Sequence, residues 1–247
     1  MKVKQLSGSS LRAVVFDLFH TLVDPEDFRP RNFRRTVRVA DLLQVDHDHF
    51  TSYWEQTSSI RNTNRSNTVV KLVEKYLSKT GRTSDADILA QVDYELGRYQ
   101  DLAIVHPRPN VGPLLKTLAG QGFKLGLLTN SDEREIREWP HSQLVSYFDA
   151  ACFSCEIGFE KPQLEAYRKV LERLGTPASE AAYVGDGGSN ELEGARAAGF
   201  GLVVFMKMFV ADNGLRTSDE LGVFMESADT TAETLEELPV ILASRSR

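Results

Sequence analysis

Short, continuous runs of apolar residues recur along the chain and alternate with segments of helical spacing. The runs span residues 13–16, 125–128, 150–153, 182–184 and 202–205. Continuous rather than alternating apolar residues are typical of parallel strands that are buried on both faces. Residues 111–118 and 164–174, which lie between such runs, place apolar side chains at helical spacing. Because strands alternate with helices, we predict an α/β fold with a doubly wound, parallel, Rossmann-like sheet.

The segment between the first two runs breaks this alternation. Residues 24–105 contain no convincing strand, and their apolar residues follow helical spacing in three stretches, 33–43, 69–77 and 88–99. An all-helical stretch of this length inside a strand–helix–strand unit is typical of an inserted domain rather than a loop. We therefore predict an all-helical cap over 24–105 and a core formed by 1–23 together with 106–247.

Composition and charge narrow the possible partners. The chain has 247 residues, of which 41% are hydrophobic and 26% charged, and its formal net charge is -6. A negative field disfavours nucleic acid, and no apolar run approaches the ~20 residues needed to cross a membrane. The polar residues 1–10 do not resemble a signal peptide. The two cysteines, Cys152 and Cys155, favour a structural role in a reducing compartment, so we expect a cytoplasmic protein, with its oligomeric state open.

Polar side chains follow the predicted strands at the points where the strands end. They are Asp17 after the first strand, Thr129 and Asn130 after the second, Lys161 in the loop after the third, and Asp186 and Glu191 after the fourth. Ligands of open α/β sheets bind outside the carboxyl ends of the strands, so these side chains are expected to converge. An acidic pair suits a hard cation, a lysine and a hydroxyl suit an anion, and a carboxylate can act as a nucleophile.

The same residues carry a resemblance to a known family. The stretch Phe16-Asp17-Leu18-Phe19-His20-Thr21-Leu22 resembles the first motif of the haloacid dehalogenase superfamily, and residues 127–130 resemble the second. Lys161-Pro162 with Tyr167 is similar to the third motif, and residues 184–195 to the fourth. The four motifs occur in order, and a helical insert directly after the first resembles the family's first (C1) class of cap.

The resemblance implies a role for each of these residues. Asp17 would be the nucleophile, forming an aspartyl-phosphate in phosphatases or an aspartyl ester in dehalogenases. Thr129 would hydrogen-bond phosphoryl oxygens, and Lys161 would pair with Asp17 and the substrate anion. Mg²⁺ would be held by Asp17, the backbone carbonyl of Phe19, Asp186 and Glu191, the last either directly or through a water.

Phe19 departs from the phosphatase pattern. Phosphatases of this family usually carry a second aspartate here, which protonates the leaving group, and general acid–base catalysis is typically worth ~10²–10⁴-fold. An aromatic residue here resembles the 2-haloacid dehalogenases, which work without metal and lack the acidic pair. Because Asp186 and Glu191 are present, the sequence favours a Mg²⁺-dependent phosphohydrolase acting on a small phosphorylated metabolite. A 2-haloacid dehalogenase, a phosphonate hydrolase with a cap lysine, and a lapsed catalyst that binds or regulates are the alternatives.

Several further residues have both a structural and a functional interpretation. Asn130 either caps a following helix or contacts substrate, and His20 either packs or supplies a proton. His47 and His49 flank Asp48 in a stretch interpreted as a solvated loop. The arginine cluster at residues 29, 31, 34, 35 and 38 predicts a helix with a basic face, either solvated or overhanging the site, where Arg34 and its neighbours would bind a carboxylate or a second phosphate.

Overall fold

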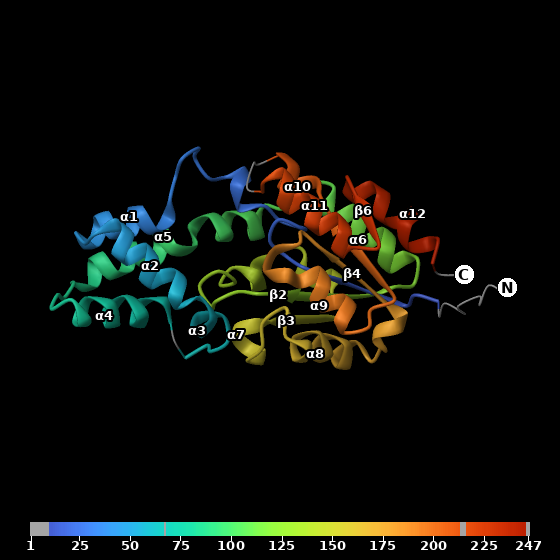
Figure 1. Cartoon of the computed structure of the whole chain (residues 1–247), viewed down its shortest axis with the longest axis horizontal. Helices are drawn as coiled ribbons and strands as arrows, with labels where there is room; N and C mark the ends of the chain where they lie inside the picture. The colour runs from blue at the N-terminus through green and yellow to red at the C-terminus, as the bar shows by residue number, and fades with distance from the viewer. Residues whose placement is uncertain (1–9, 67, 213–215, 246–247) are drawn as a thin grey trace.

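The computed structural model describes residues 10–66, 68–212 and 216–245, and its centre is a six-stranded parallel sheet (Figure 1). The strands are β1 (Ala13–Phe16), β2 (Lys124–Thr129), β3 (Ala150–Phe153), β4 (Ala181–Gly185), β5 (Leu202–Met206) and β6 (Thr230–Ala232). Their order in the sheet is β3-β2-β1-β4-β5-β6, and every neighbouring pair is parallel. The chain therefore builds outward from β1 in one direction and then in the other, which confirms the doubly wound α/β prediction and places the switch point beside β1.

Helices cover both faces of the sheet. One face carries α6 (Val111–Gly120) and α12 (Leu238–Ala243), and the other carries α8 (Leu164–Leu174) and α9 (Glu191–Ala197). In β1, Val14 and Phe16 pack into the first layer, while Ala13 and Val15 pack into the second, and all four are fully buried. Burial on both sides explains why the strands appear in the sequence as unbroken apolar runs.

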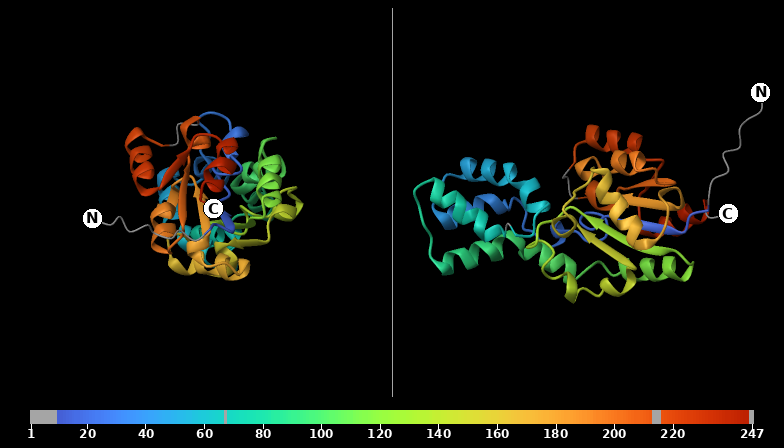
Figure 2. Two further views of the ribbon diagram at one scale, coloured as in Figure 1. Left: turned by 90° about the vertical axis from the view of Figure 1, so that its right-hand side faces the viewer. Right: turned by 90° about the horizontal axis from the view of Figure 1, so that it is seen from below.

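Five of the helices between β1 and β2 lie beside the sheet rather than on its faces (Figures 1 and 2). They are α1 (Arg35–Leu43), α2 (His47–Gln56), α3 (Ser58–Asn62), α4 (Val69–Lys79) and α5 (Ala86–Val105). They enclose an apolar cluster of their own, which includes Phe50, Trp54, Val73 and Leu96. The division into a core and a cap with boundaries at residues 24 and 105 stays a prediction.

The solvated loop expected around Asp48 is instead the start of α2. Asp46 is the residue before the helix, and its side chain accepts a hydrogen bond from the backbone N–H of His49 at 2.8 Å. His47 pairs with Asp41 at 2.7 Å, and the His49 ring lies 3.0 Å from the Tyr76 hydroxyl. An aspartate cap of this kind begins a helix without any apolar periodicity in its first turn.

The carboxyl-terminal part contains elements that the apolar pattern did not predict. They are α10 (Met208–Asp212) and α11 (Ser218–Ser227), followed by β6, and residues 213–215 between the two helices lie outside the described residues, as do residues 1–9 of the polar amino terminus. Thr217 and Glu220 form a reciprocal capping box at the start of α11. The sequence signal for this helix was therefore the Thr-x-x-Glu spacing rather than the periodicity.

The two cysteines are buried and unbridged in the described structure. Cys152 lies in β3 and Cys155 in the short helix α7 (Ser154–Ile157). Burial raises the pKa of Cys152 to about 11 and that of Cys155 to about 12. Thiols held in this protonated state are poor nucleophiles, which agrees with a structural role. Among the described helices, none is long and apolar enough to span a membrane.

Candidate active site

The side chains that follow β1, β2 and β4 meet Lys161 in one cavity of about 160 Å³ at the carboxyl edge of the sheet. Its lining residues are Asp17, Phe19, His20, Thr129, Asn130, Lys161, Asp186, Gly188, Ser189, Glu191 and Arg216. The structure thus brings together every strand-end residue that the sequence singled out. It adds Arg216, which sequence reasoning missed.

Asp17 is the first residue after β1 and is buried. Its backbone N–H donates to the carbonyl of Val184 at 2.9 Å, which fixes it against β4. The Thr21 hydroxyl donates to Oδ2 at 3.2 Å, and the Lys161 ammonium donates to Oδ1 at 2.5 Å. Burial raises the pKa of Asp17, Lys161 opposes this, and the charge of Asp186 adds to it, so the net pKa shift is upward.

Lys161 is a buried cation shared by two carboxylates. Its Nζ lies 2.5 Å from Asp17 and 2.5 Å from Glu191, and it also donates to the Tyr183 hydroxyl at 3.1 Å. Burial alone would lower the pKa of this ammonium, but the two carboxylates outweigh burial and raise it. Lys161 is therefore charged across the physiological range and supplies fixed positive charge beside Asp17.

Asn130 holds the backbone that carries Lys161. Its Oδ1 accepts the Lys161 N–H at 2.7 Å, and its Nδ2 donates to the Lys161 carbonyl at 2.9 Å. No α-helix begins at Asn130, since the following described residues form turns, so the helix-cap interpretation is wrong. The carboxamide positions the lysine loop while lining the cavity.

Glu191 begins α9 and is buried beneath the cavity. Besides its contact with Lys161, its Oε2 accepts the Tyr183 hydroxyl at 2.6 Å, and its Oε1 accepts the Gly187 N–H at 3.0 Å. Burial is the main reason that the pKa of Glu191 is raised to about 8, with Lys161 opposing and the Asp17 charge reinforcing the shift. This carboxyl is thus short of positive charge.

The acidic residues form a group suited to a divalent cation. Asp17, Asp186 and Glu191 each offer an oxygen atom within 4.8 Å of the others, and all three are buried. Lys161 contacts only two of these three carboxylates, so an oxygen-preferring cation such as Mg²⁺ matches both the donor atoms and the missing charge. Arg216 lies 3.4 Å from Asp186 and compensates part of that charge from outside.

Phe19 and His20 occupy a tight turn directly after Asp17. The His20 N–H donates to the Val23 carbonyl at 2.7 Å, and the His20 backbone adopts a left-handed φ of 59°, which is uncommon for a residue other than glycine. The imidazole Nδ1 lies 2.9 Å from Asp24 Oδ1. Burial lowers the pKa of His20. The Asp24 hydrogen bond and the nearby carboxylates, including Asp186, raise this pKa by more than burial lowers it, so the net shift is upward.

A second cavity of about 380 Å³ adjoins the first and shares Phe19, His20, Asn130 and Arg216 with it. From the arginine cluster, only Arg29 and Arg35 line it. Helix α1 begins at Arg35, so the expected helical face of residues 31, 34, 35 and 38 is wrong. Arg34 precedes the helix, is exposed and lines neither cavity.

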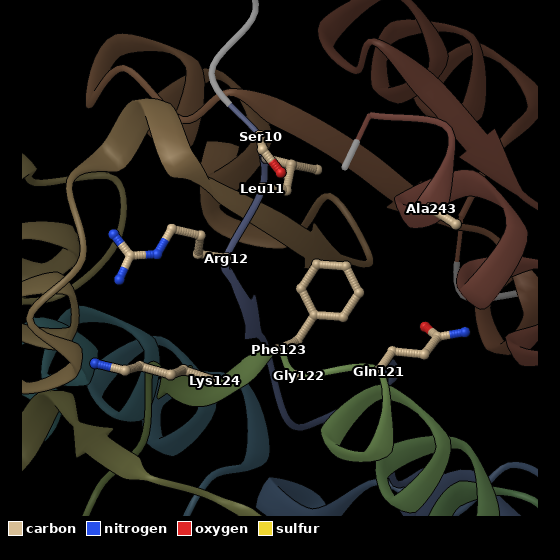
Figure 3. A pocket seen from close by; sticks show the side chains of 8 residues that line it. All are labelled: Ser10, Leu11, Arg12, Gln121, Gly122, Phe123, Lys124 and Ala243. Carbon is tan, nitrogen blue, oxygen red and sulfur yellow. The ribbon is translucent and has the colours of Figure 1, made fainter. Parts of the chain in front are cut away.

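A larger hollow of about 420 Å³ lies at the opposite edge of the sheet, where β1 and β2 begin (Figure 3). Figure 3 shows Arg12 and Lys124 extending to one side and Phe123 to the other. Arg12 pairs with Glu180 at 3.0 Å, and Lys124 donates to the Leu174 carbonyl at 2.6 Å. Asp17, Asp186 and Glu191 do not line this hollow, so its larger volume does not make it the candidate active site.

Comparisons with known proteins agree with this arrangement. The chain is 26% identical over 221 residues to a glyceraldehyde 3-phosphate phosphatase of Methanopyrus kandleri, an alignment covering 87% of this chain and 92% of that protein. Among solved structures, a HAD phosphatase from Thermococcus onnurineus matches with a TM-score of 0.60 and 22% identity over 94% of this chain and 98% of the other. A 2-haloacid dehalogenase from Pseudomonas syringae pv. Tomato DC3000 matches with a TM-score of 0.62 and 23% identity over 95% and 99%.

The two structural likenesses establish the fold, and they do not separate phosphatase from dehalogenase. The sequence profile of the haloacid dehalogenase-like hydrolases matches residues 11–199, which include Asp17, Thr129, Lys161, Asp186 and Glu191. This match spans most of the chain and all four motifs. The chain belongs to the haloacid dehalogenase-like hydrolase family.

Proposed function

We propose that the chain is a Mg²⁺-dependent phosphohydrolase that acts on a small phosphorylated metabolite with Asp17 as its nucleophile. The observation that carries the proposal is the buried group of Asp17, Asp186 and Glu191, with oxygens within 4.8 Å of one another, together with the Lys161 ammonium 2.5 Å from Asp17. Dehalogenation needs no such acidic group. The phosphatase named among the relatives, aligned over 87% of this chain, supports the same choice.

In this mechanism an oxygen of Asp17 attacks phosphorus, the bond from phosphorus to the leaving oxygen breaks, and water later hydrolyses the aspartyl-phosphate. Lys161 and the Thr129 hydroxyl bind the phosphoryl oxygens, where their charge and dipole stabilise the negative charge of the transition state. Glu191 and Tyr183 hold the lysine ammonium in place through contacts of 2.5 and 3.1 Å.

We propose that Mg²⁺ is held by carboxylate oxygens of Asp17 and Asp186 and by the backbone carbonyl of Phe19. Glu191 would complete the set from beneath, directly or through a water, while retaining its lysine contact. When bound, the cation neutralises charge on the phosphoryl group and the carboxylates. Phe19 serves this purpose as well as an aspartate would, because a backbone carbonyl is present in both.

His20 is the residue that we propose as proton donor to the leaving oxygen in place of the missing aspartate at position 19. Asp24 orients its ring through Nδ1 at 2.9 Å, which leaves Nε2 for a ligand in the cavity. Burial lowers the pKa of His20, but the Asp24 hydrogen bond and the nearby carboxylates raise it by more, so the net shift favours the protonated imidazolium that a proton donor requires.

Helices α1 to α5 are proposed to act as a cap that excludes water and selects the substrate. The apolar cluster that α1, α2, α4 and the first part of α5 share supports this role, while Ala103 and Ile104 at the end of α5 pack into the core cluster. The contact with the core includes Arg61, which donates to Asp132 at 3.3 Å, and Arg35, which pairs with Glu135 at 3.1 Å. A cytoplasmic location is part of the same proposal.

Removal of metal is expected to lower the hydrolysis of p-nitrophenyl phosphate by about tenfold or more, because the acidic group then repels the substrate dianion. The measurement is turnover of the purified protein with Mg²⁺, with EDTA, and with EDTA followed by excess Mg²⁺. Equal turnover in all three would contradict a metal-dependent site.

The second candidate function is 2-haloacid dehalogenation, which the aromatic side chain of Phe19 favours. Halide departs without a proton, so that reaction needs no acid at position 19. Release of chloride from 2-chloropropionate in EDTA, without hydrolysis of any phosphate ester, would replace the phosphatase proposal.

Mg²⁺ binding near pH 7 is expected to release about one proton, because a cation displaces the proton that the crowded carboxylates hold. The pKa of about 8 for Glu191 without cation, raised chiefly by burial, predicts this proton. Calorimetric titration with Mg²⁺ in two buffers of different ionisation enthalpy measures it. Glu191→Gln should reduce the release, and heats that are independent of the buffer in the unmodified protein would contradict the prediction.

A further inference from the structure

The second cavity is walled by basic side chains from three separate parts of the chain. Arg29 comes from the segment after β1, Arg35 from the start of α1, and Arg216 from the segment before α11. Glu26 and Glu135 also line the cavity, so three guanidinium groups face two carboxylates. The lining of this cavity therefore has more basic than acidic side chains, in a chain whose formal net charge is -6.

Each of the two glutamates pairs with one arginine and uses only some of its N–H donors. Arg29 pairs with Glu26 at 2.6 Å, and Arg35 pairs with Glu135 at 3.1 Å. Arg35 also donates to the Leu96 carbonyl at 2.8 Å, but a guanidinium carries five N–H donors, so donors remain for other acceptors. Among the described atoms, the buried Nε of Arg29 and that of Arg216 have no hydrogen-bond partner.

Arg216 connects the two cavities. It lines both of them, and its guanidinium lies 3.4 Å from Asp186 of the acidic group. The cavity beside Asp17 is therefore continuous, along Arg216, with the one that Arg29 and Arg35 line. The amide of Gln100, which is buried, adds a further polar group to the wall of the second cavity.

We infer that the second cavity binds an anionic group at the far end of the substrate, so that the substrate is a short phosphate monoester carrying a carboxylate or a second phosphate. This inference rests on the proposed phosphohydrolase function and specifies its substrate class. Arginine recognises both groups through paired, charge-assisted hydrogen bonds, which are about twice as strong as neutral ones. Arg29 is the main determinant, because it lines only the second cavity and has an unpartnered buried donor.

The test compares three substrates with one carbon skeleton: 3-phosphoglycerate, glycerol 1,3-bisphosphate and glycerol 3-phosphate. The first two carry a second anion, and the third carries a hydroxyl at the same place. Hydrogen bonds to charged groups predict a kcat/KM roughly 10- to 100-fold higher for at least one doubly anionic substrate. The better of the two identifies the second anion as carboxylate or phosphate.

The ratio to follow is kcat/KM for the better doubly anionic substrate divided by kcat/KM for glycerol 3-phosphate. Arg29→Ala should bring this ratio close to one by raising KM for the doubly anionic substrate, and Arg29→Lys should restore part of the ratio. Arg34→Ala is the matched control in the same segment. Because both substrates are measured on the same variant, a general loss of folded enzyme cancels in the ratio. A ratio near one in the unmodified protein, or a ratio that Arg29→Ala leaves unchanged, would overturn the inference.

A binding experiment separates failure of this inference from failure of the proposed function. Calorimetry compares phosphonoacetate with methylphosphonate, which lacks the carboxylate, and neither measurement depends on turnover. If no phosphate ester is hydrolysed but phosphonoacetate binds at least tenfold tighter in an Arg29-dependent way, the subsite stands and the reaction is wrong. Equal binding of phosphonoacetate and methylphosphonate, together with equal kcat/KM for glycerol 1,3-bisphosphate and glycerol 3-phosphate, would contradict the anion subsite. The proposed hydrolysis would not be affected by that result.

Discussion

Replacing Asp17 with asparagine is expected to reduce hydrolysis of p-nitrophenyl phosphate by roughly 10⁴-fold or more, the scale seen when a catalytic nucleophile is removed. The carboxamide has the same shape but cannot attack phosphorus at a useful rate. The Thr21 hydroxyl retains an oxygen acceptor in the variant, and Lys161 retains its contact of 2.5 Å with Glu191. The loss should therefore be chemical rather than structural.

Two measurements accompany the rate. Thermal unfolding of Asp17→Asn should occur at or above the temperature for the unmodified protein, because the change removes one of three crowded, buried carboxylates while Lys161 keeps its pairing with Glu191. Mass spectrometry of acid-quenched enzyme should detect one added phosphoryl group on the unmodified protein and none on the variant. If Asp17→Asn keeps more than a few per cent of the activity, direct attack by water replaces the covalent mechanism.

The sheet was predictable from sequence wherever both faces of a strand are buried. The residues of β1 and β3 coincide with the apolar runs at 13–16 and 150–153, because layers of helices cover both sides of these strands. Strand β6 was not predicted, because it has only three residues, Thr230, Thr231 and Ala232, and lies at the edge of the sheet. A half-buried, polar edge strand has no apolar run to reveal it.

The residues around Asp17 were predictable because each follows a strand, and parallel strands end at one edge. Arg216 was not, because it follows no strand and reaches the cavity only through the return of the chain after β5. The prediction of a basic helical face from the arginine cluster was wrong for a related reason. Spacing predicts a helical face only once the start of the helix is known, and Arg34 directly precedes α1 without a side-chain cap to mark it.

His20 directly follows Phe19, the residue that departs from the family pattern, and sequence and structure each provide evidence about its role. The sequence places a histidine directly after Phe19, and the structure gives that position a left-handed backbone that favours glycine. Histidine adopts this conformation more often than most residues other than glycine, and here the residue lines the cavity together with Asp17. Its hydrogen bond to Asp24 specifies which ring nitrogen remains for chemistry.

His20→Asn is expected to lower the hydrolysis of glycerol 3-phosphate by roughly 10²- to 10³-fold, because an alkoxide is a poor leaving group without a proton. Asparagine is chosen because it tolerates a left-handed backbone. Hydrolysis of p-nitrophenyl phosphate should fall only a few-fold, because p-nitrophenolate departs unprotonated. Equal losses for the two substrates would mean that His20 shapes the cavity and donates no proton.

The pH profile of the unmodified enzyme provides an independent readout of the same donor. The pKa of His20 is raised above its usual value of 6.5, so the protonated, active form should persist to higher pH than for an unperturbed histidine. Activity toward glycerol 3-phosphate should be present below this pKa and lost as the pH rises through it. Activity toward p-nitrophenyl phosphate should not show this loss at high pH. With glycerol 3-phosphate, Asp24→Asn should move the loss of activity to lower pH.

The combination of His20→Asn with Phe19→Asp tests whether the two positions exchange one role. An aspartate at position 19 restores the acid that most phosphatases of this family carry, so it should recover a large part of the rate that His20→Asn loses with glycerol 3-phosphate. The same Phe19→Asp change in the presence of His20 should gain little, because a donor is already there. A large gain in both backgrounds would show that His20 supplies no proton and that the chain works without an acid, with substrates whose leaving groups need none.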